Sequence, residues 1–422
     1  MRQQTPSDRE RNREPRWFTV GIGSVGATSF FSDTGHEMVT SVLPAFVIGT
    51  LGGSAAALGA IEGCADALTG LSKLAGGPLA DDPRRRQRLA SGGYTVTAIA
   101  TAAIGFATMV WQVGVLRSVS WAARGFRAPA RDALLADLAG PDARGRAYGV
   151  ERAGDNIGAV VGPLLGGVLA AWVGLQMTIF VSVVPGLLAA AAIVFAARQA
   201  RRLHTEPVTR QRLRDGYRRL RGTGIGRALI PAGLFEAGNL AATLLILRGN
   251  QLLIADGIST VAAVSLTTIL YAAYNAAAAV TAIPAGHLVD RVGARPILAV
   301  GAISYVIAYL GFAFITPNGH GTTIWIVLGC FVLGGAGIGL GETAQSTLIA
   351  GTVPPQLRGS AFGLFGLVQA GGDVAATVVG GTLYTLVSPV ACFGYAAAWM
   401  AASAVCASTL RERRRDPGAE TR

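Results

Sequence analysis

Four ionisable side chains stand inside long apolar stretches at spacings that suit reversible proton binding. Asp33 and Glu37 are four positions apart, Asp66 falls in the next apolar stretch, and Arg124 lies in the middle of a later one. A charge in lipid is costly, so an acid there either pairs with a base or takes up a proton. We therefore expect Asp33, with Glu37 or Asp66, to exchange a proton under the influence of Arg124. The alternative is a static ion network that holds helices together.

Further polar and aromatic residues in the apolar stretches are candidates for lining a cavity that holds a small molecule. Most of the acids and bases fall in the first half of the chain. We therefore expect proton binding chiefly in the first half, and apolar and aromatic contacts chiefly in the second. The predicted cavity residues are His36, Glu62, Arg127, Asp155, Glu236, Asn239, Tyr271, Tyr274, Asn275, Glu342 and Asp373.

The composition indicates that membrane-spanning helices position these residues. Of 422 residues, 51% are hydrophobic and only 14% are charged, and the mean hydropathy is +0.46. So few polar side chains cannot coat a soluble protein of this size, whereas the 57 glycines suit close helix packing in lipid. The predicted fold class is therefore an all-α membrane protein.

Charge distribution and cysteine spacing exclude two other classes of protein. The net charge is +12, but the surplus arginines stand in short segments between apolar runs, which argues against nucleic acid as a partner. The four cysteines form neither pairs nor CxxC spacings, so neither a disulfide framework nor a metal site is expected.

Twelve apolar spans are long enough to cross a bilayer. Arginines gather before the first span and after every even-numbered span, so both termini are predicted to be cytoplasmic. The predicted spans are 18–49, 55–80, 89–109, 111–138, 147–172, 174–197, 228–254, 259–287, 295–316, 322–350, 359–386 and 389–410.

One long polar segment divides the spans into two groups of six. This basic linker is expected to form either an amphipathic helix on the anionic inner leaflet or a solvated connection. The predicted units are a cytoplasmic tail at 1–17, a six-helix bundle at 18–197, the linker at 198–227, a second six-helix bundle at 228–410 and a cytoplasmic tail at 411–422.

A duplicated pattern relates the two bundles. A shift of 214 positions places Arg144 on Arg358 and Gly158 on Gly372. The bundles are therefore predicted to be pseudo-symmetric copies of one unit, in which Arg144 and Arg358 mark equivalent turns.

Two loop motifs carry a family resemblance. The second span closes with Gly77-Pro78-Leu79-Ala80-Asp81, and the eighth closes with Gly-His-Leu-Val-Asp-Arg-Val-Gly-Ala-Arg at 286–295. Both resemble the Gly-x-Leu-x-Asp-Arg-x-Gly-Arg-Arg loop of the major facilitator superfamily, although Asp82 and Arg84 replace the arginine and glycine in the first copy. The resemblance implies a twelve-helix transporter whose halves are latched by this loop. It implies gating roles for Gly77, Asp81, Arg85, Gly286, Asp290, Arg291, Gly293 and Arg295.

The fifth span resembles a second signature of this superfamily, Gly-x-x-x-Gly-Pro-x-x-Gly-Gly, which is associated with antiporters. Glycines four positions apart line one helical face and allow close crossing, while a proline removes a backbone hydrogen bond. We expect a bendable seam between moving parts, and ordinary helix packing is the alternative. The matching residues are Gly158, Gly162, Pro163, Gly166 and Gly167.

Together these features predict a secondary transporter that exports a small organic molecule in exchange for protons by alternating access. One alternative is proton-coupled uptake or exchange of an anionic metabolite, because Arg117, Arg124 and Arg127 are suited to clamp a carboxylate or phosphate. A second alternative is a non-transporting membrane receptor.

The sequence also predicts the cofactors, partners and location of the protein. It has no phosphate-binding loop and no HExxH or GxSxG pattern, so neither an ATP-driven pump nor an enzyme is expected. Protons are the only expected cofactor, as coupling ions. The expected partners are a small-molecule substrate and the lipid bilayer, and the protein is expected to act as a monomer with many crossings of the inner cell membrane.

Overall fold

The computed structural model describes residues 17–203, 213–317 and 321–409. Within these ranges the chain forms helices and no strand, which confirms the predicted all-α fold. The predicted tails at 1–17 and 411–422 lie outside the described residues, except for Trp17. The stretch 204–212 of the predicted linker also lies outside them.

Local capping fixes where the first helices begin. The Thr19 hydroxyl accepts a hydrogen bond from the Ile22 N–H at 3.3 Å, and the Ser54 hydroxyl accepts one from the Ala57 N–H at 3.1 Å. The helices of the first half are α2 (Val20–Pro44, continued by the π-helical turn Ala45–Thr50), α3 (Ala55–Ala80), α4 (Pro83–Ala103), α5 (Val110–Leu138), α6 (Arg144–Val173), α7 (Leu175–Val181) and α8 (Val183–Leu203).

The second half follows a short linker helix, α9 (Leu213–Leu220). One helix or a broken pair of helices, α7 with α8 or α10 with α11, occupies each of the twelve predicted spans. The helices of the second half are α10 (Ile225–Gly238), α11 (Ala242–Ala255), α12 (Thr260–Val292), α13 (Ala294–Phe314), α14 (Thr323–Thr352), α15 (Arg358–Leu386) and α16 (Pro389–Thr409).

Nine helical segments in the described part of the chain are long and apolar enough to cross a membrane, by length and composition. The other long helices, α2, α3 and α5, contain most of the charged residues that we selected for proton binding or for the cavity, and these residues lower the mean hydropathy of their helices. A low hydropathy is expected of helices that face a polar interior. The number of twelve crossings therefore stays a prediction.

Helix α4 begins earlier than predicted. The third span was expected to start at 89, but Asp82 accepts a hydrogen bond from the Arg84 N–H at 2.9 Å and Pro83 occupies the first helical turn. Aspartate at the N-cap and proline just inside it are favourable helix starts. The arginines placed by the sequence in a turn therefore belong to the first turns of α4.

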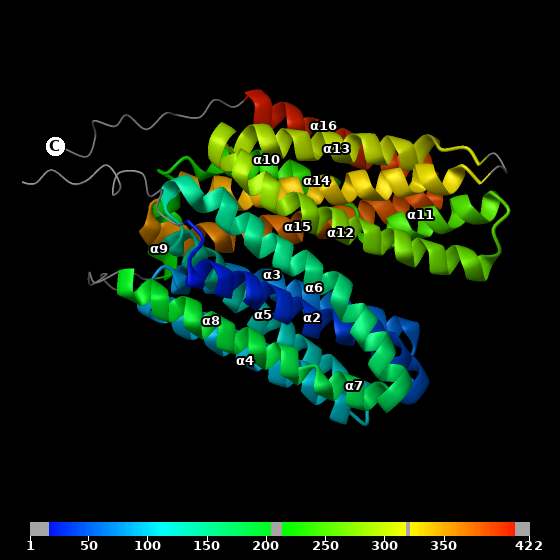
Figure 1. The fold of residues 1–422 in the computed structure, drawn as a ribbon, viewed down its shortest axis with the longest axis horizontal. Coiled ribbons are helices and arrows are strands. Elements are labelled where there is room, and N and C mark those ends of the chain that lie inside the picture. The colour runs from blue at the N-terminus through cyan, green and yellow to red at the C-terminus, as the bar shows by residue number, and fades with distance from the viewer. Residues whose placement is uncertain (1–16, 204–212, 318–320, 410–422) are drawn as a thin grey trace, which may run out of the picture.

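Two groups of helices meet at one end of the molecule and diverge toward the other (Figure 1). Within the first group α2 packs on α6 and α3 on α5, and within the second α13 packs on α14 and α16. The two groups touch mainly through α6 against α12 and α3 against α15. The contact between the halves is thus made by two helix pairs related by the sequence repeat.

Close contacts between α2 and α6 depend on glycine. A Cβ on Gly158 would lie 2.6 Å from the Phe30 carbonyl oxygen, and one on Gly162 would lie 2.7 Å from the Thr34 carbonyl oxygen. Gly166 is equally tight against α2, whereas a Cβ on Gly167 would meet nothing within 4 Å. Pro163 lies inside α6 without ending it. The glycine stripe of the fifth span therefore packs on the helix that contains Asp33.

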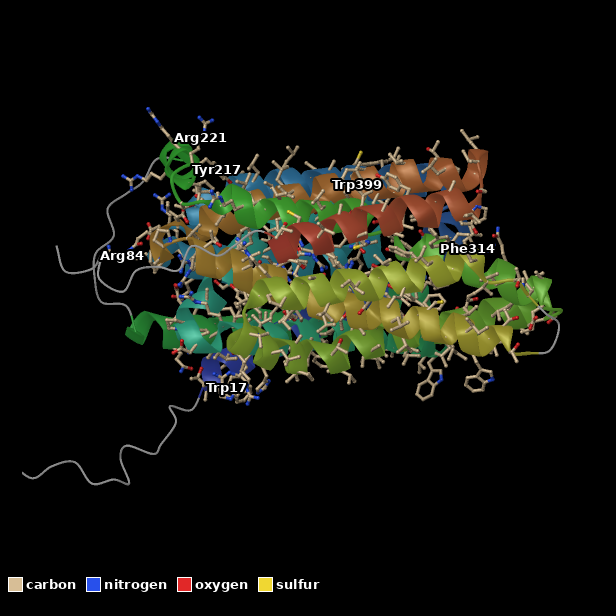
Figure 2. All side chains as sticks on the ribbon, turned by 90° about the horizontal axis from the view of Figure 1, so that it is seen from above. Trp17, Arg84, Tyr217, Arg221, Phe314 and Trp399 are labelled. Carbon is tan, nitrogen blue, oxygen red and sulfur yellow. The ribbon has the colours of Figure 1, made fainter. Side chains whose placement is uncertain are left out.

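The end where the halves meet is also rich in arginine, and we call it the basic end. Trp17, Arg84, Tyr217 and Arg221 all lie there (Figure 2). By the excess of positive charge this end is predicted to face the cytoplasm.

The predicted linker is partly helical. Helix α8 continues to Leu203, and α9 lies on the basic end against α3 and α15. The Tyr217 hydroxyl donates a hydrogen bond to the Leu74 carbonyl, and Leu220 is buried, while Arg218 and Arg219 are exposed. The apolar side of α9 thus covers the contact between the two halves of the protein.

Candidate functional site

A cavity of about 410 Å³ lies between the two halves, and we call it the acidic cavity. Carboxylates from α2, α6, α14 and α15 line it, and none of the described residues in its wall is a lysine or arginine. It brings Asp33 together with most of the predicted cavity residues. Its polar and charged lining residues are Asp33, Asp155, Asn156, Asn239, Tyr271, Tyr274, Asn275, Glu342, Asp373 and Thr377.

A second cavity of about 250 Å³ adjoins the first, and we call it the mixed-charge cavity. The two share Asp155, Asn239, Glu342 and Asp373 as lining residues. In the wall of the mixed-charge cavity, basic and acidic residues are equal in number. They are Lys73, Arg124, Arg127, Arg131, Arg152, Asp132, Asp155, Glu236, Glu342 and Asp373.

An ion pair between α2 and α5 stands at the boundary of the two cavities. The Arg124 Nη2 donates to Asp33 Oδ1 at 3.1 Å, and the guanidinium lies 4.9 Å from the Trp121 ring centroid. Asp33 lines the acidic cavity and Arg124 lines the mixed-charge cavity. The Arg124 Nη1 is buried without a hydrogen-bond partner in the described structure. The pairing expected from the sequence is therefore present, with one donor of the arginine unused.

The other predicted proton-binding acids form no ion pair with Arg124 among the described residues. Glu37 faces His36 at 3.7 Å, and the His36 ring packs 4.4 Å from the Trp121 ring. Asp66 is exposed and lines neither cavity. The part of Asp66 in proton binding therefore stays a prediction, because helical spacing along α3 does not determine its distance from α2.

Two further acids of the first half have arginine partners. Arg117 donates to Glu62 at 3.1 Å, and Arg131 contacts Glu151 at 2.8 Å. Arg127 differs, because it donates to the Ser32 hydroxyl at 2.9 Å and has no carboxylate within 4.0 Å among the described residues. Compensated acids of this kind have little reason to take up a proton while the pairs persist.

Glu236 on α10 has a different environment. Its side chain is buried, and its carboxylate accepts hydrogen bonds from the Asn239 and Gln369 amides, both at 3.4 Å. No lysine or arginine in the described part of the chain lies within 4.0 Å of it. A buried carboxylate without a cation is costly to ionise. The second half thus contributes an acid suited to proton binding, although the sequence pointed chiefly to the first half.

Aromatic side chains from α12 and α13 surround the same region. The rings of Tyr271 and Tyr274 stack with centroids 5.7 Å apart, and the hydroxyls of Tyr274 and Tyr305 are 2.6 Å apart. Tyr305 also donates to Asn239 Oδ1 at 3.4 Å. Asn275 donates to the Tyr271 carbonyl at 3.2 Å. Aromatic faces and carboxylates together form a wall that attracts cations.

At the basic end, Asp290 fastens α12 to the start of α6. Its carboxylate accepts hydrogen bonds from the Gly145 N–H at 2.6 Å and from the Arg146 N–H at 3.0 Å, and the Arg146 Nε donates to it at 2.9 Å. Gly286 allows this approach, because a Cβ there would lie 2.7 Å from the Gly145 carbonyl carbon. A carboxylate at a helix N-terminus is electrostatically favourable.

Asp81 fastens α3 to the start of α15 in the equivalent way. Its carboxylate accepts hydrogen bonds from the Ser360 N–H at 2.9 Å and from the Ser360 hydroxyl. A Cβ on Gly77 would lie 2.8 Å from the Gly359 carbonyl oxygen. The two loop motifs thus make two matching latches, each between a motif aspartate and the first turn of a helix in the other half.

A bridge at Asp137 adds to the second latch. Arg358 on α15 donates to Asp137 at 2.7 Å, and Arg86 pairs with the other oxygen of the same carboxylate. Arg85, which the motif had suggested, is half exposed and among the described residues pairs with Asp82 alone, at 3.5 Å. The bridging contact is therefore made by Arg86 in this structure, and a gating role for Arg85 stays a prediction.

The comparison with known proteins decides the family. Residues 25–270 and 253–422 match the family model described as Major Facilitator Superfamily. The chain belongs to the major facilitator superfamily. Transporters of this superfamily are generally not enzymes, and this one is a multi-pass membrane transporter.

Relatives and solved structures agree with this assignment. An uncharacterized MFS-type transporter from Methanocaldococcus jannaschii is 24% identical over 388 residues, which cover 92% of this chain and 94% of that protein. The multidrug resistance protein MdtG from Salmonella arizonae is 27% identical over 332 residues, 76% of this chain and 78% of that protein. A bacterial homologue of the iron transporter ferroportin, solved in an outward-facing state, shares the fold with a TM-score of 0.71, 15% identity, and coverage of 93% of this chain and 99% of that one.

Other residues of the motifs in this transporter lie outside the latches. Arg291 is exposed, and Gly293 has a φ of 92°, which favours glycine between α12 and α13. Arg144 and Arg295 line a separate cavity at the basic end. Among the described residues no group of histidine, cysteine and acidic side chains has an arrangement suited to a metal ion.

Three residues that hold the transporter's halves together were not selected from the sequence. Ser360 and Asp137 belong to the latches, and Arg152 approaches Glu342 of the other half at 3.7 Å. Asp137 and Arg358 are 221 positions apart, so no local pattern could have joined them. The sequence repeat was the one signal that could have pointed to the latch contact of Ser360, because it aligns the first turn of α15 with that of α6.

The latch at Asp81 should respond to pH. Burial raises the pKa of Asp81 to about 6, against the opposing effect of its hydrogen bonds from Ser360. An exposed aspartate titrates near pH 4, so between about pH 4 and 6 the latched state binds more protons than an unlatched one. Lowering the pH from about 7 to 5 should therefore favour the latched state, by up to about tenfold per pH unit. Asp81→Asn should lose this part of the pH dependence.

Distances between spin labels on the two sides of the basic end would measure that equilibrium. Asp142 and Val292, both exposed, are suitable labelling positions in a cysteine-free background. An identical pH response in the wild type and in Asp81→Asn would contradict the prediction.

Proposed function

We propose that this transporter exports small organic cations in exchange for protons. The observation that carries the proposal is the acidic cavity, which lies between the halves and has four carboxylates and no basic residue among its described lining residues. Its volume of about 410 Å³ is within the range of small-molecule sites. The same carboxylates that attract an organic cation also bind protons, so the two compete.

The Asp33–Arg124 pair is proposed as the coupling site. In the state described, Arg124 compensates Asp33, which favours the ionised acid. A helix movement that withdraws Arg124 would leave the acid buried and uncompensated, and the acid would then take up a proton. Loading and release of the proton thereby follow the position of α5 relative to α2.

Alternating access is proposed to work through the two latches. Both are closed in this structure, so passage toward the basic end is blocked while the halves diverge at the opposite end (Figure 1). Breaking the contacts of Asp81 and Asp290 would open the basic end. The similarity to the multidrug resistance protein MdtG supports export as the direction. In this proposal the protein works as a monomer in the cell membrane and needs no cofactor other than protons.

Exchange or uptake of an anionic metabolite is the second candidate. The mixed-charge cavity favours it, because Arg124, Arg127, Arg131 and Arg152 all line that cavity. However, five acids line the same wall as these four arginines and Lys73, and Arg131 already contacts Glu151 at 2.8 Å. In the acidic cavity, Asp33, Asp155 and Glu342 also have arginine partners, but none of those arginines lines the wall, which presents carboxylates alone. We therefore favour a cationic substrate.

Transport by inside-out vesicles containing the full-length protein tests the proposal. Acidifying the lumen should drive accumulation of a permanent organic cation such as ethidium, and collapsing the pH gradient should release it. Fluorescein serves as the matched anionic probe. Proton-driven loss of preloaded fluorescein from the lumen, without ethidium accumulation, would favour the anionic alternative and contradict the proposal.

A further inference from the structure

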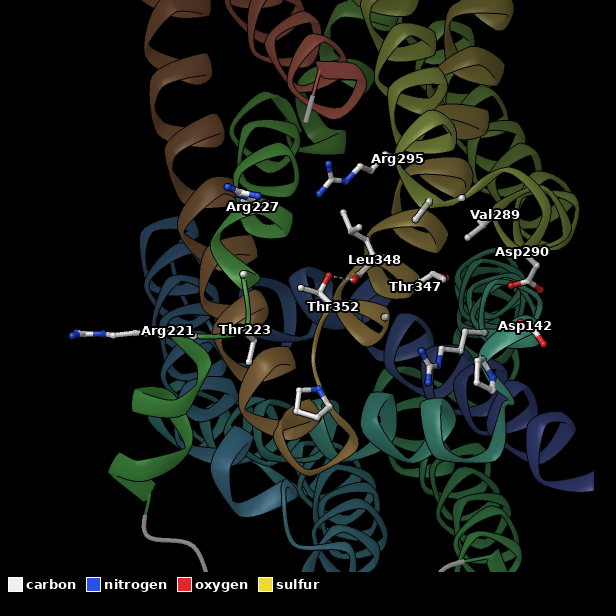
Figure 3. A pocket seen from close by; sticks show the side chains of 18 residues that line it. Asp142, Arg221, Thr223, Arg227, Val289, Asp290, Arg295, Thr347, Leu348 and Thr352 are labelled. Atoms are coloured by element: carbon white, nitrogen blue, oxygen red, sulfur yellow. Dashed lines mark hydrogen bonds between the residues drawn. The ribbon is translucent and has the colours of Figure 1, made fainter. Parts of the chain in front are cut away.

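A third cavity, larger than the acidic and mixed-charge cavities, lies at the basic end. Its volume is about 940 Å³, and its wall includes the turn before α6, the starts of α10 and α13 and the end of α14 (Figure 3). Neither the acidic cavity nor the mixed-charge cavity shares a lining residue with it. We call it the basic cavity, because Arg144, Arg221, Arg227 and Arg295 belong to its lining.

Arg295 is a buried arginine of this cavity with unsatisfied hydrogen-bond donors. Its side chain is only 8% exposed, and its Nε and Nη1 are buried without hydrogen-bond partners in the described structure. No carboxylate among the described residues lies within 4.0 Å of its guanidinium. A buried guanidinium with unused donors is costly, and an anion would remove that cost.

Two helices begin in the wall of the basic cavity. Helix α10 follows Gly224 and helix α13 follows Gly293, and neither N-cap provides a side-chain hydrogen bond. Uncapped helix N-termini present N–H groups and positive potential, both of which favour phosphate. Arg227 lies in the first turn of α10, on the same side of the cavity as Arg295 (Figure 3).

The acids in the wall do not cancel this positive charge. Asp290 is engaged by Gly145 and Arg146 in the latch, and Asp142 is exposed at the rim. Arginine forms strong paired hydrogen bonds with phosphate oxygens. Basic pockets at the inner face of membrane proteins are suited to anionic headgroups, and soluble phosphate compounds offer the same chemistry.

We propose that the basic cavity binds a phosphate-bearing anion through Arg227 and Arg295. The ligand is either the headgroup of an anionic lipid or a soluble phosphate compound. The turn at Pro141–Arg144 belongs to the first half of the protein and the rest of the wall to the linker and the second half, so the bound anion stabilises the state in which the latches are closed. This site is independent of the transported substrate and of the coupling ion.

Thermal unfolding of the purified full-length protein tests the site, with inorganic phosphate as the soluble probe at constant ionic strength. Vesicles of phosphatidylethanolamine with or without phosphatidylglycerol are the lipid probe. At saturation, one of the two should raise the unfolding midpoint by about 3–5 °C. Stabilisation by phosphate would identify a soluble ligand, and stabilisation by phosphatidylglycerol alone would identify a headgroup.

Three matched substitutions complete the test. Arg295→Gln and Arg227→Gln should each lose at least about half of the stabilisation, because each removes a charged hydrogen-bond donor from the site. Arg227 is exposed, so folding of that variant does not depend on a buried side chain. Arg219→Gln is the control, since this arginine is exposed on α9 and does not line the cavity. The proposal is overturned if neither probe stabilises the wild type, or if Arg219→Gln loses as much as the other two.

Discussion

Replacing Asp33 by asparagine is expected to lower proton-driven transport at least about tenfold while leaving the protein folded. Asparagine has the same shape, and its carbonyl oxygen can still accept the hydrogen bond that Arg124 donates at 3.1 Å. It has no proton to exchange, so a pH gradient can no longer drive the cycle. Exchange of labelled for unlabelled substrate requires no net proton movement and should persist.

Both activities can be measured on one preparation of proteoliposomes. Asp82→Asn is a matched control, because it makes the same chemical change at the start of α4, where asparagine caps a helix as well as aspartate does. The assignment of Asp33 is wrong if Asp33→Asn transports at the wild-type rate under a proton gradient.

A second large effect is expected from Gly286→Leu. A side chain at this position would collide with the backbone of Gly145 and Arg146, where even a Cβ would be 2.8 Å from the Arg146 Cα. Because backbone atoms cannot move aside without separating α6 from α12, the variant should be unable to close at the basic end. Transport should fall at least about tenfold. The distance between labels at Asp142 and Val292 should lengthen by several ångströms.

Gly167→Leu provides the control for this prediction. It is the same substitution within α6, at a glycine whose added Cβ would meet nothing within 4 Å. This variant should keep both the short label distance and the transport rate. A normal label distance in Gly286→Leu would show that the glycine contact does not govern closure.

The sequence predicted the helices well because each span is a long apolar run bounded by caps and arginines. It treated 228–254 as a single span, whereas the structure breaks it at Asn239–Ala241 between α10 and α11. Gly238 and Asn239 were the local signal for the break, and the break allows Asn239 to reach both cavities. Broken helices at a binding site are stabilised by tertiary contacts, such as the Tyr309 hydroxyl that accepts the Leu240 N–H at 3.1 Å.

The site could be predicted only in part. Asp33 and Arg124 were selected because charges are rare in apolar spans, and the loop motifs pointed to Asp81 and Asp290. The sequence could not tell which acids have partners, since Glu62 is paired with Arg117 while Glu236 has only amide partners. That difference depends on which helices face one another across the molecule. Helical periodicity gives the face of one helix but not the identity of its neighbour.

The central claim is that an organic cation and a proton move in opposite directions through one site. The most direct test uses proteoliposomes without a pH gradient, loaded with a dye that reports internal pH. A gradient of an organic cation, chosen because it stabilises the purified protein, is then imposed. Our account predicts proton movement opposite to the cation, and the loss of this movement in Asp33→Asn. Cation transport without proton movement, or with protons moving in the same direction, would contradict it.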